Sequence, residues 1–514
     1  MLHSTAFLKT AFCLVLLLGL NANGTFLRAA VQPNSLFTDG MVLQRDTPVP
    51  IWGTAANGEK ITVKFAGQSV DTTAQDGKWL VKLQPLNTSA QPSTLTISGE
   101  NTVTINTVLV GDVWVCSGQS NMERQLGPRP PQPLIDNWEQ EAASADFPNI
   151  REFFVPEKGL PAPIDDLNGK WVVCTPQTAP TFSAISFFFA RALYQKINVP
   201  IGLLFSAVGG TPVEAWTSKE ALESKPEGKE VYAAYDKALQ DYPAKLADFQ
   251  QHQAELMQKY NDALAKAQAA NQPPPPKPGP PHDPAQHDLP NRHYNAMIAP
   301  IIPYAIRGAI WYQGEANSGH GKAYQTLFPL MISDWRQRWG EGDFPFLFVQ
   351  LAPYRGNSPD VREAQLLTAQ TVAKTAVIVT TDLGDPTNVH PPHKAPVGER
   401  LALAARAVAY GEKIEYSGPL FDKAETAGSQ ITIHFTHVGS GLLAKDGALK
   451  GFEIAGADKK FSPADAVIKD DTVVVSSATV PTPVYVRYGW NSVPEVNLYN
   501  KEELPASPFR TDTD

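Results

Sequence analysis

The chain has 514 residues, of which 43% are hydrophobic and 18% charged, and its formal net charge is -9 at pH 7. This length exceeds what one hydrophobic core organises, so roughly two to four domains are expected. The acidic balance comes without a run of lysine or arginine, which argues against nucleic acid and anionic membranes as partners.

The N-terminus has the order of parts found in a secretory signal peptide. Lys9 precedes an apolar run at residues 11–20, and small residues follow at Ala22-Asn23-Gly24. The run is too short to span a bilayer, so we expect a signal peptide over residues 1–24, cleaved between 24 and 30. A buried N-terminal helix is the alternative. Cys13 lies inside the run rather than after it, so we expect export to a periplasm or the cell exterior without a membrane anchor.

Removal of that segment leaves Cys116 and Cys174. Two cysteines make neither a disulfide scaffold nor a zinc site, and no metal or other cofactor is predicted. One bridge between them and two buried thiols are both compatible with an oxidising compartment.

Three regions follow along the chain. Residues 31–107 show short alternating runs separated by Asn57-Gly58 and Asp76-Gly77 turns, which predict a small β-sandwich. Residues 108–410 alternate strand-like and helical patterns, which predicts an α/β domain with a parallel sheet and helices on both faces. Residues 411–514 return to β patterning and predict a second β domain.

Two segments interrupt the α/β region. Residues 217–270 are rich in Ala, Lys, Glu and Gln at helical spacing, so we expect a helical hairpin insertion. The proline-rich stretch at 273–290 predicts a stiff, extended connector. A proline-rich recognition ligand is the alternative, but the sequence implies no partner for it.

The run VWVCSGQSNM at residues 113–122 carries the clearest chemical signal. An apolar strand brings the chain to the rim of a sheet, Gly118 permits a tight turn there, and Ser120 is left exposed at the start of the next helix. This placement is typical of a hydrolase nucleophile. Such a serine needs a base and an oxyanion hole.

Further loops at strand ends supply candidates for both. His390 lies in a loop after the apolar run 376–380, on the rim where Ser120 is expected, and is the candidate base; a structural histidine is the alternative. The Ser120 N–H is one oxyanion donor. Gly209-Gly210 ends another apolar run and allows close backbone approach, and a third donor is expected from the loop at 311–317.

The motifs together resemble a known family. They are GQSNM at 118–122, GGT at 209–211 through EAW at 214–216, WYQGE at 311–315, and HP at 390–391 through Lys394. In this order they resemble the sialate O-acetylesterase family of the SGNH hydrolase superfamily. The similarity extends over nearly the whole mature chain, including MVLQ at 41–44, GFEIA at 451–455 and RYGW at 487–490.

The resemblance implies a flavodoxin-like, three-layer α/β/α hydrolase domain flanked by β-sandwich-like domains, and hydrolysis of O-acetyl esters on sugars. By position, Ser120 is the nucleophile and His390 the general base. Gly209 or Gly210 is the second oxyanion donor. Gln313 or Asn317 stands where the superfamily places an asparagine donor.

One position departs from the superfamily pattern. The acid that orients the histidine often lies three residues before it, and this position is Thr387 here. A threonine cannot stabilise an imidazolium by charge, so we expect Asp385 to take the role. Asp382, Asn388 and a backbone carbonyl are the alternatives.

Several polar and aromatic residues are candidates for substrate contact. They are Gln119, Asn121, Glu315, Arg362, Gln365 and Trp490, and Trp216 and Tyr294 are further candidates for an aromatic platform. The motifs belong to acyl chemistry and leave the sugar open between O-acetyl sialic acid and acetylated plant polysaccharide such as xylan or xyloglucan. A carbohydrate-binding protein with a lapsed esterase site is the competing hypothesis. The sequence does not specify the oligomeric state.

Overall fold

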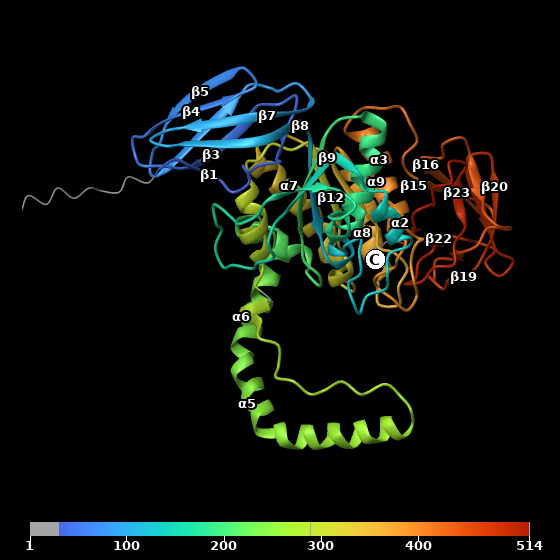
Figure 1. Cartoon of the computed structure of the whole chain (residues 1–514). Helices are drawn as coiled ribbons and strands as arrows, with labels where there is room; N and C mark the ends of the chain where they lie inside the picture. Colours follow the sequence, from blue (N-terminus) through green and yellow to red (C-terminus); the bar gives the residue numbers. More distant parts are fainter. Residues whose placement is uncertain (1–29, 288, 513–514) are drawn as a thin grey trace, which may run out of the picture.

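The computed structural model describes residues 30–287 and 289–512, so the expected signal peptide lies outside the described residues. A central sheet with its helices lies between two β-rich segments, and a long helix projects from one side (Figure 1). None of the helices in the described ranges combines the length and apolarity that crossing a bilayer requires.

The central sheet has the strand order β10-β9-β11-β8-β12-β13-β14. Its strands are β8 (Thr102–Gly118), β9 (Phe147–Phe154), β10 (Trp171–Cys174), β11 (Ile201–Ala207), β12 (Gly308–Tyr312), β13 (Phe346–Val349) and β14 (Thr375–Ile378). All neighbouring pairs along this path are parallel except β10 and β9. Strands β11 to β14 are buried at every position, as expected for parallel strands covered on both faces. The mixed α/β class is therefore confirmed.

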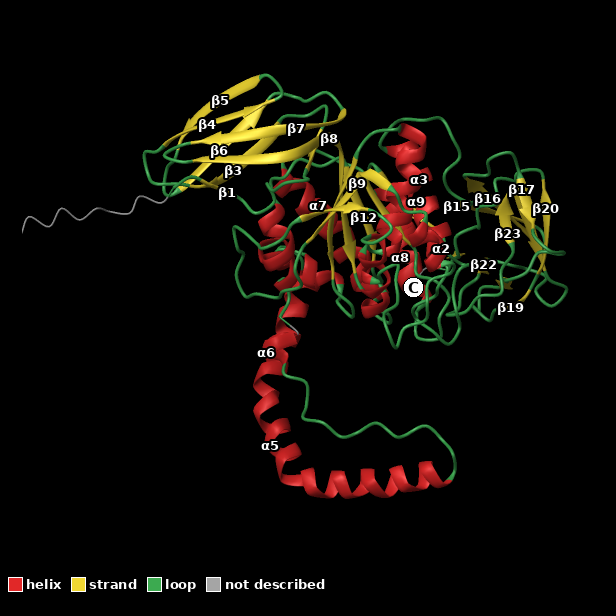
Figure 2. Ribbon diagram, viewed as in Figure 1, coloured by secondary structure: helices red, strands yellow, loops and turns green. Residues whose placement is uncertain are grey.

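Helices pack on both sides of this sheet (Figure 2). Helix α3 packs against α9, and α7 packs against α8. The helices of the α/β region outside the insertion are α1 (Ser120–Glu123), α2 (Trp138–Ala143), α3 (Ala184–Ile197), α7 (Gly321–Trp339), α8 (Pro359–Thr371) and α9 (Lys394–Val408). Short 3-10 or π turns are η1 (Ala179–Thr181), η2 (Val213–Trp216), η3 (Tyr294–Ile298), η4 (Ala299–Ile301) and η5 (Glu315–Asn317).

The strand register brings three loops to one rim. Gly118, the last residue of β8, pairs with Ala207 of β11 on one side and with Tyr312 of β12 on the other. The chain therefore leaves the sheet at the same level after each of these strands. These exits carry the expected nucleophile, the glycine pair and the amide loop.

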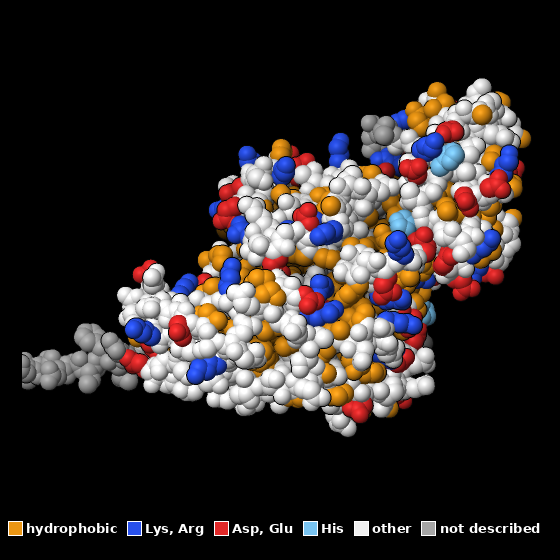
Figure 3. All heavy atoms as spheres, turned by 90° about the horizontal axis from the view of Figure 1, so that it is seen from above, with side chains coloured by type: hydrophobic (Ala, Val, Ile, Leu, Met, Phe, Trp, Pro, Cys, Tyr) orange, Lys and Arg blue, Asp and Glu red, His pale blue; other side chains and the backbone are white. Residues whose placement is uncertain are grey.

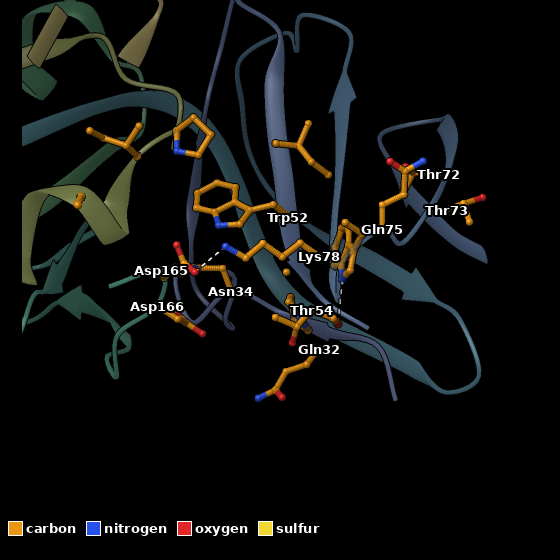
Figure 4. A pocket seen from close by; sticks show the side chains of 17 residues that line it. Gln32, Asn34, Trp52, Thr54, Thr72, Thr73, Gln75, Lys78, Asp165 and Asp166 are labelled. Atoms are coloured by element: carbon orange, nitrogen blue, oxygen red, sulfur yellow. Dashed lines mark hydrogen bonds and ion pairs between the residues drawn. The ribbon is translucent and has the colours of Figure 1, made fainter. Parts of the chain in front are cut away.

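Strand β8 also links the sheet to the N-terminal β segment, because β2 and β7 pair with its first half. That segment contains β1 (Gln32–Pro33), β2 (Val42–Gln44), β3 (Val49–Thr54), β4 (Lys60–Phe65), β5 (Gln68–Thr73), β6 (Lys78–Leu83) and β7 (Ser89–Ser98). It thus lies toward the amino end of β8, away from the rim at Gly118. A cavity of about 550 Å³ lies where it meets the α/β region, beside Trp52 and the Lys78–Asp165 ion pair of 2.6 Å (Figure 4).

The insertion differs from the expected hairpin. After α4 (Lys219–Glu223), a single helix, α5 (Pro226–Ala269), runs for 44 residues. Its sequence offers good helix formers and no turn signal, so one continuous helix forms. Pro243 lies inside it, where a proline removes a hydrogen bond and favours a bend, and Figure 1 shows the helix bending sharply. The proline-rich segment then returns without regular structure to α6 (Pro284–His287).

The C-terminal β segment forms small antiparallel sheets. Its strands are β15 (Leu420–Ala427), β16 (Gln430–Thr436), β17 (Leu442–Ala444), β18 (Phe452–Ala455), β19 (Ser462–Pro463), β20 (Asp465–Lys469), β21 (Thr472–Ser476), β22 (Tyr485–Tyr488), β23 (Leu498–Asn500) and β24 (Phe509–Arg510).

The two cysteines of the α/β region, Cys116 and Cys174, are both free and buried, so they form no disulfide with each other.

Candidate active site at the rim of β8, β11 and β12

Ser120 is held by a turn that only glycine can make. Gly118 has a φ of +140°, and a Cβ there would lie 2.2 Å from the carbonyl oxygen of Tyr312. The Gln119 N–H donates to the same oxygen at 2.9 Å. The turn is thus fixed to β12, and Ser120 follows as the partly exposed first residue of α1.

The glycine pair after β11 lies directly against this serine. A Cβ on Gly209 would be 3.3 Å from the Ser120 Cβ, so the close approach depends on glycine. The Gly209 N–H donates to Glu123 Oε2 at 2.7 Å. Gly210 is exposed and has a φ of +74°. No motif in the sequence predicts a role for Glu123, although this residue lies one helical turn after Ser120.

Asn121 ties three loops together from a buried position. Its amide nitrogen donates to Glu315 Oε1 at 2.6 Å and to the Val389 carbonyl at 2.9 Å. Its amide oxygen accepts from Lys394 Nζ at 2.5 Å. Because Asn121 is only 1% exposed and fully committed to these bonds, the expectation that it contacts substrate is corrected to a positioning role.

The groups that Asn121 joins have strongly perturbed protonation equilibria. Burial lowers the pKa of Lys394 to about 7, and the nearby Glu315 carboxylate opposes that shift. Burial raises the pKa of Glu315, while its bond from Asn121 and the charge on Lys394 act the other way. Among the described residues Glu315 Oε2 has no partner. Glu315 and Lys394 thus form, with Asn121, a buried polar network next to the nucleophile. All three residues belong to the sequence motifs, but the motifs alone do not predict that they contact one another.

His390 presents an unused ring nitrogen. Its Nε2 is buried and has no hydrogen-bond partner within the described chain, while its backbone N–H donates to Asn388 Oδ1 at 2.8 Å. Burial lowers the pKa of His390, and the positive charges of Lys394, Arg124 and Arg129 add to that effect. Glu123 acts in the opposite direction. A neutral imidazole with a free nitrogen can accept a proton.

The acid expected to orient His390 makes other bonds. Asp385 Oδ1 accepts from the Thr387 N–H at 2.7 Å, from the Thr387 hydroxyl at 2.8 Å and from the Asn388 N–H at 3.1 Å. Aspartate commonly bonds its own backbone in this way and so stabilises a turn. The expectation for Asp385 is therefore corrected to a turn-forming role. Asp382 is paired with Arg400 instead.

The two candidate amide donors after β12, Gln313 and Asn317, differ in how many of their N–H groups are already hydrogen-bonded. Gln313 is fully buried, and its amide nitrogen donates to Asn317 Oδ1 at 2.7 Å and to the Thr211 carbonyl at 3.1 Å. Both of its N–H groups are thus used, which corrects its assignment as an oxyanion donor. Asn317 donates one N–H to Glu214 Oε2 at 3.0 Å and lines a cavity beside the rim.

Other expected substrate contacts are structural. Arg362 and Gln365 are 0% exposed, and all their nitrogens bond backbone carbonyls. Gln119 is 3% exposed and accepts the Ala316 N–H at 3.1 Å. Burial of these side chains corrects the expectation that they touch substrate.

Two of the three aromatic candidates are too deeply buried to form a binding platform. Trp216 and Tyr294 are core residues, 0% and 4% exposed. Trp490 is half-buried, with the Arg510 guanidinium 4.8 Å from its ring centroid. The stacking role expected for Trp216 and Tyr294 is therefore corrected to core packing.

A cavity of about 550 Å³ opens beside Gly210 and Asn317. Helix α5 forms one wall, so the insertion shapes the space beside the glycine loop that follows β11. Its ionisable lining residues are Glu214, Glu227, Glu230, Tyr235, Arg292, His293 and His320. A cavity of this size at the carboxyl edge of a parallel sheet is the usual place for a ligand.

Comparisons with known proteins identify the family of the chain. The family described as "Carbohydrate esterase, sialic acid-specific acetylesterase" matches residues 285–407. The sialate O-acetylesterase of Rattus norvegicus is 30% identical over 91% of this chain and 92% of its own length, and that of Homo sapiens is 28% identical over 92% and 91%. The crystal structure of a carbohydrate acetylesterase from Xanthomonas citri superimposes with a TM-score of 0.77 at 35% identity, over 94% of this chain and 100% of that one. The chain therefore belongs to the sialate O-acetylesterase family and is a carboxylic ester hydrolase.

Proposed function

We propose that this protein is a serine esterase that removes O-acetyl groups from carbohydrates through an acetyl-enzyme on Ser120, with His390 as the base. One hydrogen bond carries the proposal. Asn121 donates to the Val389 carbonyl at 2.9 Å, and these two residues are the chain neighbours of Ser120 and His390. Residues 270 positions apart are thus brought to one place, beside glycines suited to an oxyanion hole.

The reaction follows from these groups. As Ser120 Oγ attacks the acetyl carbonyl, His390 Nε2 accepts its proton, and backbone N–H groups stabilise the oxyanion. The C–O bond to the sugar then breaks, and His390 returns the proton to the leaving hydroxyl. A water molecule attacks the acetyl-enzyme with His390 again as base, which releases acetate and restores the serine. The lowered pKa of His390 keeps it in the neutral form that this role needs.

The cavity beside Gly210 favours an uncharged sugar over a sialic acid. Its lining carries two carboxylates of α5, Glu227 and Glu230, in addition to the buried Glu214, and one guanidinium, that of Arg292. Burial lowers the pKa of His293 to about 4, so it adds no charge at neutral pH. An excess of negative charge repels the carboxylate of a sialic acid, whereas sugar hydroxyls donate to carboxylates. We therefore assign the protein to O-acetylated, uncharged glycans such as plant polysaccharides.

Acetate release from a substrate panel tests both statements. We expect a higher kcat/KM on O-acetylated neutral oligosaccharides than on O-acetyl sialic acid. The double variant Glu227→Gln/Glu230→Gln raises kcat/KM on the sialic acid by about fourfold, from about 0.4 kcal/mol per charge at roughly 10 Å in water. Glu255→Gln, on the exposed part of the same helix, is the control. A wild-type preference for the sialic acid contradicts the choice of substrate.

The competing hypothesis, a carbohydrate-binding protein with a lapsed site, predicts glycan binding without acetate release from any member of the panel. Export is also part of the proposal, supported by the apolar run at residues 11–20. The surface fits the exclusion of nucleic acid, because the face in Figure 3 shows acidic and basic side chains interspersed.

A further inference from the structure

Glu123 lies beside the glycine pair that follows β11. It ends α1, one helical turn after Ser120, and its side chain is 16% exposed. Its Oε2 accepts the Gly209 N–H at 2.7 Å, and its Oε1 is paired with Arg129. A carboxylate held on both sides in this way is a rigid partner for the glycine loop.

The bond from Gly209 to Glu123 distinguishes the two glycines as candidate oxyanion donors. An N–H that already donates to a carboxylate is not available to an oxyanion, so Gly209 is a poor donor. The Gly210 N–H has no hydrogen-bond partner in the described part of the chain. The Ser120 N–H is likewise free of a helical partner, because it opens α1.

We propose that Glu123 is a positioning residue: by binding the Gly209 N–H it fixes the glycine loop so that the Gly210 N–H, with that of Ser120, forms the oxyanion hole. The inference rests on the proposed function, and it assigns the donor that the sequence left open between two glycines.

The charge of Glu123 has a second consequence. His390 is also near the cations of Lys394, Arg124 and Arg129, and Glu123 is the anion that opposes them. A carboxylate here favours the imidazolium formed during the reaction.

Two variants separate the hydrogen bond from other roles. Glu123→Ala removes the acceptor, and we expect kcat to fall by about tenfold to a hundredfold with KM nearly unchanged, less than the loss of a whole oxyanion donor. Glu123→Gln keeps an acceptor oxygen at the same reach, and we expect it to restore kcat to within about fivefold of wild type. Glu139→Ala, an exposed glutamate on α2, is the control.

The outcomes are distinct. An unchanged or increased kcat in Glu123→Ala overturns the inference, and so does a Glu123→Gln variant as slow as Glu123→Ala. Thermal unfolding of each variant shows whether a loss of kcat reflects a loss of fold. If Ser120→Ala stays active, the proposed function itself fails; if Ser120→Ala is inactive while Glu123→Ala behaves as wild type, only this inference fails.

Discussion

Arg362 joins the α/β region to the C-terminal β segment, and its replacement by methionine should loosen that junction. The guanidinium donates to the carbonyls of Leu351 and Ala352 at 2.7 and 3.1 Å, and to those of Asn491 and Ser492 at 2.7 and 2.8 Å. Methionine keeps the apolar stem and removes all four bonds. Among the described residues, the change leaves the carbonyls of Leu351 and Asn491 without a donor. The Ala352 carbonyl keeps the Asn357 amide, and the Ser492 carbonyl keeps the Tyr354 N–H.

The magnitude follows from the two carbonyls that lose their donor. A buried acceptor left unsatisfied costs about 2 kcal/mol, so the two together cost about 4 kcal/mol. Burial lowers the pKa of Arg362 from 12.5 to about 10, so the guanidinium itself is unfavourably desolvated, and methionine removes that cost. The net loss in Arg362→Met is therefore below about 4 kcal/mol, still large for one substitution.

Urea unfolding and steady-state kinetics together test this account. We expect an earlier transition for the C-terminal β segment, while KM of the remaining folded enzyme stays within about twofold of wild type. Arg355→Met, at an exposed position nearby, should leave both unchanged. A variant with unchanged unfolding and a strongly raised KM would show that Arg362 binds substrate after all.

Three further predictions concern the rim. Burial and neighbouring cations lower the pKa of His390, so kcat/KM should fall to half its plateau value only at a pH below the ordinary imidazole pKa of about 6.5. Lys394→Met removes one of these cations and should move the pH of half-maximal kcat/KM upward. A wild-type midpoint above pH 7 contradicts the reasoning. Asp385→Asn keeps an oxygen for the turn at Thr387, so acetate release should change less than about threefold, and a loss above a hundredfold would return Asp385 to the role of orienting His390. Asn121→Ala breaks three buried bonds and should lower kcat by at least about tenfold with acetylated substrate, whereas unchanged kinetics would remove it from the positioning network.

Local signals were enough to predict the mixed α/β class and the strand that precedes Ser120. An apolar run that stops at Gly118 predicts a buried strand that ends in a tight turn. The structure confirms that the run is a strand, β8, in the centre of the sheet. The insertion was harder. Helical spacing predicted helix, but whether α5 folds back as a hairpin depends on a turn that the sequence does not contain.

Long-range partners explain the remaining differences. Arg362 and Gln365 have the polarity of ligand-binding residues, and nothing near them in the sequence reveals that their partners include carbonyls as far away as Asn491. Asp385 is an acid close to His390 in the sequence, yet the donors that it binds belong to its own turn. The role of Glu123 could not be predicted because its partner, Gly209, is 86 positions away in the sequence.

Acetate release by Ser120→Ala is the most direct test of the central claim. With an O-acetylated neutral oligosaccharide as substrate, and with unfolding monitored to show an intact fold, the account predicts a loss of at least about a thousandfold relative to wild type. A folded Ser120→Ala variant that releases acetate within about tenfold of the wild-type rate would contradict it.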